Sequence, residues 1–309
     1  MRITMNYSES IQDVFERFIL FKKACGLADK TISTYSQQFN SLSPYLDLTI
    51  PIDALTDTNL NNMINQMRDN GLSANTIRSY TRNLKVFLSW CNKENITEIN
   101  IKKYKGEETI KETYSDNELK TLLKKPNFKS CSFVEYRSWV IVNLLVNGGS
   151  RAATIRNIKI KDVNLDNCVI YARHTKNKKP LVIPLCSELV AILNDYLRIR
   201  RGGSEDYLFC TQNGSQLTEN ALRKSISVYN KSRGIQKTSI HLFRHTFAKK
   251  YLVDCGGNAF ALQKLLGHST LDMTKHYCAI FDSEITRDFD NFSPLSNLNM
   301  QKKRIKMNW

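Results

Sequence analysis

A polar segment divides this chain into two regions with different patterns of apolar residues. Residues 95–113 are rich in lysine, glutamate and threonine and lack a helical apolar period, which is typical of a linker between domains. Directly after it, Ser115 and Glu118 stand at the spacing of a capping box, which predicts a new helix start. With 309 residues the chain is long enough to build two hydrophobic cores. We therefore predict two domains, the second beginning near residue 113.

The first hundred residues have the apolar spacing of packed helices, beginning with Ile11, Val14, Phe15 and Phe18. Residues 26–35 and 71–80 repeat the same Gly, Leu, Thr, Ile and Tyr at matching positions, as at a helix end followed by a new helix start. The plain interpretation is a bundle of two similar helix hairpins. A sharper hypothesis is that some polar side chains of these helices lie along DNA phosphates. These candidates are Thr31, Thr76, Arg78, Arg82 and Lys85.

The second region is predicted to be mainly helical with a small antiparallel sheet. Residues 136–146 form an apolar run typical of a buried helix, and the sequence Asn-Gly-Gly-Ser ends it. Residues 168–172 and 181–185 have the composition of two strands joined by a turn. Further helices are expected over residues 189–197 and 220–229.

The charge balance indicates a polyanionic partner. Lys and Arg number 45 against 29 Asp and Glu, which gives a formal net charge of +16. Such an excess favours nucleic acid, with an anionic membrane as the weaker alternative. The longest apolar run, residues 139–146, is too short to span a bilayer, and the first residues lack the apolar stretch of a signal peptide. The eight cysteines are scattered without a CxxC pair, so we expect reduced thiols in a cytoplasmic protein and no zinc site.

Reactive side chains gather in the last third of the chain. His241, Arg244, His245, His268 and Tyr277 fall within about forty residues. Arginine binds phosphate through two parallel hydrogen bonds, imidazole donates hydrogen bonds or moves protons near neutral pH, and a phenol can act as a nucleophile. Together they suggest a site that attacks a phosphodiester without a metal. Taken singly, each also has an ordinary structural interpretation, such as a histidine buried in a core.

Three further cations could complete such a site. Arg151 follows the Gly-Gly break and could enter a cleft from a second direction, whereas Lys176 and Lys178 stand in the turn between the expected strands. A turn lysine seen alone is most often solvated. Lys178 is a candidate for contact with DNA.

The combined set resembles the signature of the tyrosine recombinases, a family that includes phage and transposon integrases and Xer-like site-specific recombinases. The residues that match in order and spacing are Arg151, Lys176, His241, Arg244, His268 and Tyr277. The likeness covers nearly the whole chain. It implies a helical SAM-like core-binding domain over residues 1–100, a linker over 101–112, an α+β catalytic domain over 113–292 and a basic C-terminal tail over 293–309.

The resemblance also implies the chemistry. Tyr277 would attack a DNA phosphate and form a 3′-phosphotyrosine, with Lys176 as the acid for the leaving 5′ oxygen. His241 would help to position the phosphate and act in proton transfer with Tyr277. No metal, ATP or other cofactor is implied.

The remaining residues of the set would hold the phosphate. Arg151 and Arg244 would bind its non-bridging oxygens and His268 would donate a hydrogen bond to it. Thr154 departs from the family, whose members often carry an acidic residue three positions after the first arginine. Threonine can accept a hydrogen bond but cannot form a salt bridge.

The partners implied are double-stranded DNA with short core sites and three further copies of the chain. Residues 284–292 would dock on a neighbouring protomer, and an accessory directionality factor is possible. The core-binding domain is expected close to Met1, without a separate arm-site-binding domain. Two alternatives stay open: a type IB topoisomerase that only relaxes DNA, and a DNA-binding protein impaired in catalysis, with which Thr154 is consistent.

Overall fold

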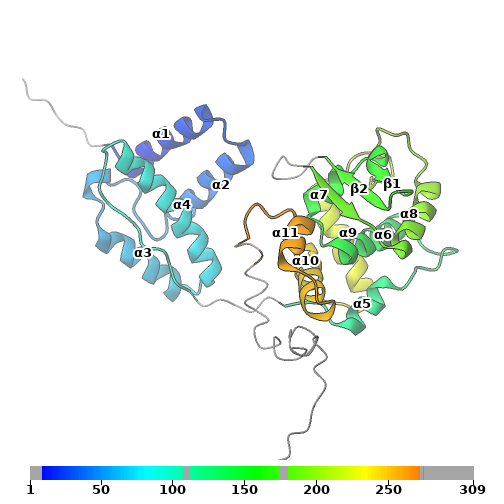
Figure 1. Ribbon diagram of the computed structural model, residues 1–309. Coiled ribbons are helices and arrows are strands. Elements are labelled where there is room, and N and C mark those ends of the chain that lie inside the picture. The colour runs from blue at the N-terminus through cyan, green and yellow to red at the C-terminus, as the bar shows by residue number, and fades with distance from the viewer. Residues whose placement is uncertain (1–8, 107–111, 174–179, 272–273, 275–309) are drawn as a thin grey trace, which may run out of the picture. The chain divides into compact units, whose positions relative to one another are not determined.

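The structure is a computed structural model that describes residues 9–106, 112–173, 180–271 and 274 (Figure 1). The chain separates into two compact units at residue 109. Several predicted features lie outside the described residues. They are Lys176, Lys178, Tyr277, the docking segment 284–292 and the tail 293–309.

The N-terminal unit is a helical bundle, as the apolar spacing predicts. Its elements are α1 (Ile11–Ala24), α2 (Asp29–Asn40), the 3-10 turn η1 (Ile52–Ala54), α3 (Asp57–Asp69) and α4 (Ala74–Lys93). Ser10, Thr56 and Ser73 cap α1, α3 and α4 with their hydroxyls, which supplies acceptors for otherwise unpaired backbone N–H groups. The two repeats predict the starts of α2 and α4 correctly.

Aromatic side chains fill the core of this unit. Phe15 stacks on Phe39 with 3.6 Å between ring centroids, and Phe87 meets both edge-on. Such pairs contribute beyond the area that they bury. Part of the predicted linker also belongs here, because Ile101 is buried in the same core. The polar composition of residues 95–113 conceals Ile96, Ile99 and Ile101, which pack on the unit.

The second unit contains seven α-helices in the residues described. They are α5 (Asp116–Leu123), α6 (Phe133–Gly148), α7 (Ala152–Asn157), α8 (Ser187–Arg200), α9 (Glu219–Ser232), α10 (Ile240–Lys249) and α11 (Ala259–Leu266). Two further turns are η2 (Ile160–Asp162) and the π-helical η3 (Lys250–Asp254). The predicted capping box of Ser115 and Glu118 is present at the start of α5.

A small antiparallel sheet completes this unit. It consists of β1 (Val163–Asn164), β2 (Val169–Ala172) and β3 (Leu181–Pro184) in that order. Ile170 is opposite both Val163 and Ile183. The fold is thus mainly helical with a small antiparallel sheet, as predicted; the two-residue β1 is an addition to the two expected strands.

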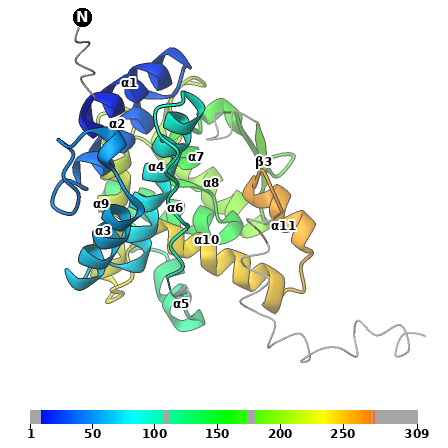
Figure 2. The ribbon, with the colours of Figure 1, turned by 90° about the vertical axis from the view of Figure 1, so that its left-hand side faces the viewer.

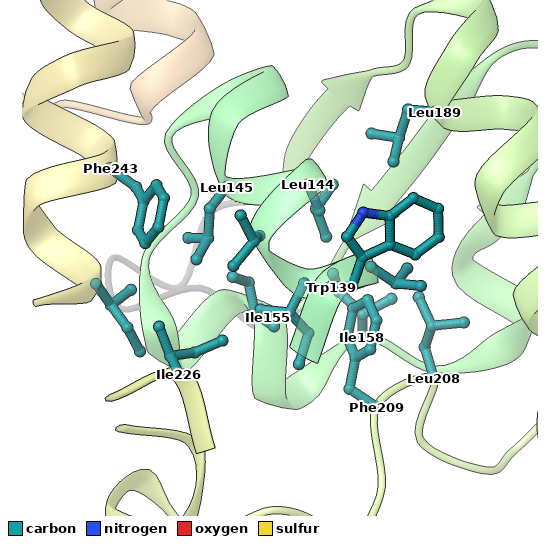
Figure 3. Close-up of a cluster of buried hydrophobic side chains, with 14 of the residues drawn as sticks. Trp139, Leu144, Leu145, Ile155, Ile158, Leu189, Leu208, Phe209, Ile226 and Phe243 are labelled. Carbon is teal, nitrogen blue, oxygen red and sulfur yellow. The ribbon is translucent and has the colours of Figure 1, made fainter. Parts of the chain in front are cut away.

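Helix α6 runs through the centre of the second core. Its Trp139, Leu144 and Leu145 pack among side chains from other elements, including Phe209 and Phe243 (Figure 3). Within the described ranges no helix is both long and apolar enough to cross a membrane. The apolar run of α6 is therefore explained by burial against α8, α9 and α10.

Candidate active site

The site is built on the C-terminus of α11. The N–H of Gly267 donates to the carbonyl of Lys264, and the N–H of His268 donates to the carbonyl of Gln263. This pair of bonds is a Schellman motif, and it needs the left-handed backbone that Gly267 adopts at φ +60°. Leu-Gly-His therefore ends the helix, places His268 on the following loop as predicted, and leaves the carbonyl of Leu266 available to other donors.

Two arginines use that carbonyl. Arg151 donates from Nη1 to the oxygens of Leu266 and Gly267, each at 3.2 Å. Arg244 donates from Nη2 to the oxygen of Leu266 at 2.9 Å. One carbonyl thus holds together two guanidinium groups that are predicted from separate motifs. The negative end of the α11 dipole lies at the same place and stabilises both charges.

Arg244 is also held by the end of a second helix. Its Nη1 donates to the carbonyl of Gly149 at 3.0 Å, and Gly149 ends α6 with φ +58°. The side chain of Arg244 is buried, with 5% of the residue exposed. Burying a charge is costly unless polar groups surround it, so the two helix ends that meet at Arg244 fix its position.

Arg151 enters from the N-terminus of α7, where it is the residue before the first helical one. The Gly-Gly break predicts this change of direction, because Gly149 takes a left-handed conformation that ends α6. Thr154 is buried one turn further along α7, at 3% exposure. The position that is often acidic in the tyrosine recombinases is therefore an uncharged, buried hydroxyl here.

His268 lies in the electrostatic field of these arginines. Burial, followed by the positive charges of Arg244 and Arg151, lowers the pKa of His268 from 6.5 to about 4. The ring is therefore neutral at pH 7. Its Nδ1 is 2.9 Å from the hydroxyl oxygen of Thr274, which is fully buried. Burial is the larger cause, and the two arginine charges add to it, so a buried neutral ring lies beside two cations that could bind a phosphate.

His241 lies at the start of α10, exposed, one turn before the buried Arg244. A cleft of about 380 Å³ runs beside it, between α9 and the start of α10. Its polar lining includes Arg223, Lys224, Ser227, Thr238 and Ser239. The sequence-based prediction omits these residues. The adjacent Arg223 and Lys224 on an expected helix were the available signal, but a basic pair on a helix is most often a solvated surface.

The predicted DNA-contact residues of the N-terminal unit lie on α2 and α4. Thr31 and Thr76 are each the third residue of their helix, and Arg82 and Lys85 are exposed. Arg78 has partners within the unit, since it donates to Asn75 at 3.1 Å and to the carbonyl of Gly106 at 2.8 Å. Arg78 therefore ties Gly106 of the predicted linker to α4.

The sequence profile of the Phage integrase family matches residues 112–284, and that of the Phage integrase SAM-like domain matches residues 10–107. The tyrosine recombinase XerD of Staphylococcus saprophyticus is 24% identical over 298 residues, which cover 93% of this chain and 99% of the relative. XerD of Oceanobacillus iheyensis is 25% identical over 300 residues, which cover 92% and 98%.

Solved structures share the fold. The Tn1549 transposon integrase in complex with a circular intermediate DNA aligns with a TM-score of 0.71 and 20% identity, over 87% of this chain and 95% of that one. A lambda integrase tetramer bound to a Holliday junction aligns with a TM-score of 0.70 and 17% identity, over 88% and 78%. With the family profile extending over more than half of the residues, the chain belongs to the Phage integrase family and is a tyrosine recombinase.

Proposed function

We propose that the protein cleaves and rejoins DNA strands at specific sites through a covalent phosphotyrosine. The observation that carries this proposal is the pair of guanidinium groups on the carbonyl of Leu266, beside the neutral imidazole of His268. Two cations and a hydrogen-bond donor in one place suit the charge that develops on a phosphate under attack. The family likeness supports a DNA phosphodiester as the substrate.

In this reaction the Tyr277 oxygen attacks the phosphorus and the bond from phosphorus to the 5′ oxygen breaks. The phenol proton leaves to a base, for which His241 is the candidate, and the 5′ oxygen takes a proton from Lys176. Arg151 and Arg244 bind the non-bridging oxygens of the phosphate. The new ester bond between phosphorus and the tyrosine oxygen replaces the bond to the 5′ oxygen that breaks. A 5′-hydroxyl can therefore attack the 3′-phosphotyrosine and reverse the step without metal or ATP.

The cleft between α9 and α10 extends this phosphate site along the DNA. Lys224 supplies a cation, Arg223 supplies a second one that is paired with Glu219 at 2.6 Å, and Thr238 and Ser239 supply two hydroxyls next to His241. Contacts of this kind position a duplex without reading its bases. Thr31, Arg82 and Lys85 are proposed to contact the same duplex from the N-terminal unit.

The assembled enzyme is proposed to be a tetramer on two duplexes, in which residues 284–292 of one copy occupy a groove on the next. This groove has a volume of about 270 Å³ and a largely apolar lining that includes Ile183, Phe247 and Leu265. Within residues 284–292, Ile285, Phe289 and Phe292 have the spacing of one helix face. Changing Ile285 and Phe289 to aspartate should abolish tetramers on paired sites but leave binding to a single site intact. An accessory directionality factor would act on this assembly.

The test uses nicked duplexes cut from the DNA on either side of the protein's own gene, because a nick traps the covalent intermediate. The wild-type protein and Tyr277→Phe are incubated with the labelled duplexes without metal or ATP, then separated on a denaturing gel. A covalent band from the wild type alone supports the phosphotyrosine mechanism.

Two other results would contradict the proposal. If both proteins shift the DNA in a native gel but neither forms a covalent band, the protein is a binder that does not cleave. If the wild type relaxes supercoiled plasmid regardless of sequence, and never joins two sites, the activity is that of a topoisomerase. The matched variant Tyr207→Phe, in the segment between α8 and α9, should behave like the wild type.

A further inference from the structure

Thr274 contacts Nδ1 of His268. Whether Nδ1 carries a proton determines whether the other ring nitrogen, Nε2, can donate a hydrogen bond to a phosphate. The hydroxyl oxygen of Thr274 lies 2.9 Å from Nδ1. A hydroxyl can donate to a bare Nδ1 or accept from a protonated one. In the first case the ring proton is on Nε2, and in the second case Nε2 carries a lone pair.

The choice matters because the ring is neutral. A protonated imidazole would have N–H groups on both nitrogens and could donate to a phosphate in either arrangement. With a pKa of about 4, His268 has one ring proton at pH 7. A bound phosphodiester brings one negative charge against the two of Arg151 and Arg244, so the site stays positive and still disfavours a protonated ring.

The surroundings of Thr274 fix the hydroxyl in place. The residue is fully buried, and its N–H donates to the carbonyl of Leu271 at 2.8 Å. On the other side, the main-chain N–H of His268 donates to the carbonyl of Gln263 at 3.0 Å. Both partners are thus anchored through their backbones, which keeps the hydroxyl within hydrogen-bonding distance of Nδ1.

We propose that Thr274 is a positioning residue for strand cleavage: its hydroxyl donates to Nδ1 of His268, which keeps the proton on Nε2 and directs that N–H to the scissile phosphate. This inference rests on the proposed cleavage of a phosphodiester. The opposite arrangement would place the Nε2 lone pair against the phosphate oxygens, and their mutual repulsion would weaken the site. The hydroxyl therefore acts on the reaction through His268.

The first test reads the ring nitrogens directly. Protein labelled with ¹⁵N-histidine is examined by NMR at pH 7, and His268→Gln identifies the resonances of His268. The expected spectrum has the proton on Nε2 and an Nδ1 that accepts a hydrogen bond, and Thr274→Val shifts Nδ1 towards the position of an imidazole without that bond. Protonated Nδ1 in the wild type, or an Nδ1 resonance unchanged in Thr274→Val, would overturn the inference.

The second test measures single-turnover cleavage of the nicked duplex. Thr274→Val has nearly the same shape as threonine but lacks the hydroxyl, and it should cleave about tenfold more slowly with unchanged DNA affinity. Thr274→Ser keeps the hydroxyl and should recover most of the rate. Cleavage by Thr274→Val at the wild-type rate would contradict the role.

A double-mutant comparison separates this role from a merely structural one. If Thr274 acts through His268, the valine substitution should have no further effect in a His268→Gln background. Equal losses in both backgrounds would mean that Thr274 acts on folding or on other groups. Should the wild type cleave no DNA at all, the proposed function fails, yet the NMR experiment still decides the arrangement of the ring.

Discussion

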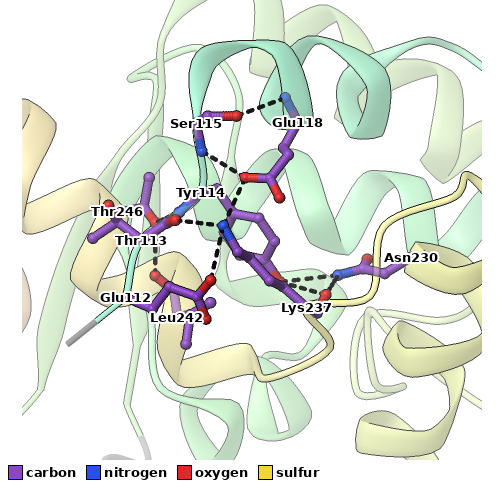
Figure 4. A network of polar contacts seen from close by, with 9 residues as sticks. All are labelled: Glu112, Thr113, Tyr114, Ser115, Glu118, Asn230, Lys237, Leu242 and Thr246. Atoms are coloured by element: carbon purple, nitrogen blue, oxygen red, sulfur yellow. Dashed lines mark hydrogen bonds and ion pairs between the residues drawn. The ribbon is translucent and has the colours of Figure 1, made fainter. Parts of the chain in front are cut away.

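Two cationic clusters of the second unit hold their charges in opposite ways. At the active site, Arg151 and Arg244 donate to main-chain carbonyls at the ends of α6 and α11. At the start of the unit, Lys237 forms ion pairs with Glu112 at 3.2 Å and with Glu118 at 3.0 Å (Figure 4). A carbonyl is a neutral acceptor, whereas a carboxylate cancels the charge that it binds.

The Lys237 cluster joins segments that are far apart in the sequence. Lys237 also donates to the carbonyl of Thr113 at 3.0 Å, and the N–H of Tyr114 donates to the hydroxyl of Thr246 on α10 at 2.9 Å. The hydroxyl of Tyr114 bonds to the carbonyl of Lys237, and Asn230 on α9 donates to that hydroxyl. The first residues of the unit are thereby fixed to the loop between α9 and α10.

Under the proposed function, the arginines are cations that bind an incoming phosphate, whereas Lys237 is a cation that stabilises the fold. Carbonyls leave the charges of the two arginines uncancelled, and after burial these charges are the next causes that lower the pKa of His268. α10 connects the two clusters, since it carries Arg244 in one and Thr246 in the other, and in the side view of Figure 2 this helix lies between α5 and α11. Substitutions should therefore affect cleavage at one cluster and stability at the other.

The largest effect is expected at Arg244. Arg244→Gln removes a cation that supports the transition state, so single-turnover cleavage should fall on the order of 100- to 1000-fold. Arg244→Lys keeps the charge but loses the planar fork, and its loss should be smaller. Lys237→Met is the matched control and should change cleavage per folded molecule less than twofold. Equal losses at Arg244 and Lys237 would remove the distinction between the clusters.

The two glycines that end α6 and α11 should give the next largest effect. Both have left-handed backbones, so an alanine costs about 1–2 kcal/mol at either position. At Gly149 the added Cβ would also lie 2.9 Å from Phe247, whereas at Gly267 the nearest atom is 3.5 Å away. The midpoint temperature of thermal unfolding should therefore be lower for Gly149→Ala than for Gly267→Ala. Gly267→Asn tolerates the left-handed backbone better and should be milder still.

The sequence proposes the members of the active site from separate motifs, but it does not predict how they are arranged. Leu-Gly-His indicates a helix end because few residues other than glycine take a left-handed backbone, and the structure agrees. No pattern shows that the Leu266 carbonyl joins Arg151 and Arg244, because 115 residues separate Arg151 from Leu266. Main-chain acceptors have no residue identity, so a sequence cannot indicate them.

The fold was predictable where apolar spacing is long and regular. The helices α1 and α6 follow from such runs, whereas β1 has two residues and too little length for any period. Thr274 and Lys237 were missed for a different reason. Each matters through the residues that it contacts in the fold. In sequence, neither a lone threonine nor a lone lysine differs from a surface residue.

A smaller effect is expected from the Lys237 cluster itself. Lys237→Met should lower the free energy of unfolding by about 1 kcal/mol, since a partly exposed ion pair contributes little in water. Glu118→Gln should cost more than Glu112→Gln, because 23% of the Glu118 side chain is exposed against 66% of Glu112. Denaturant unfolding of the single and double variants measures the coupling. Additive losses for Lys237 and Glu118 would show that their ion pair contributes nothing.

The smallest expected effect is a difference in how the two clusters make the free energy of unfolding depend on pH. The pKa of His268 falls from 6.5 in the unfolded chain to about 4 in the folded one, so the unfolded state binds more protons in that window and stability declines as the pH drops through it. Burial works to raise the pKa of Glu118, but hydrogen bonds from Ser115 and Lys237 outweigh it and hold that pKa below 4.5. Its stabilisation is therefore complete above pH 4.5 and is lost only as the pH falls further. In denaturant titrations from pH 7.5 to 3.5, His268→Gln should flatten the slope between pH 6.5 and 4. Glu118→Gln should flatten it only below pH 4.5. If His268→Gln leaves the slope between pH 6.5 and 4 unchanged, burial and the two arginines do not lower the pKa of His268 in the folded protein.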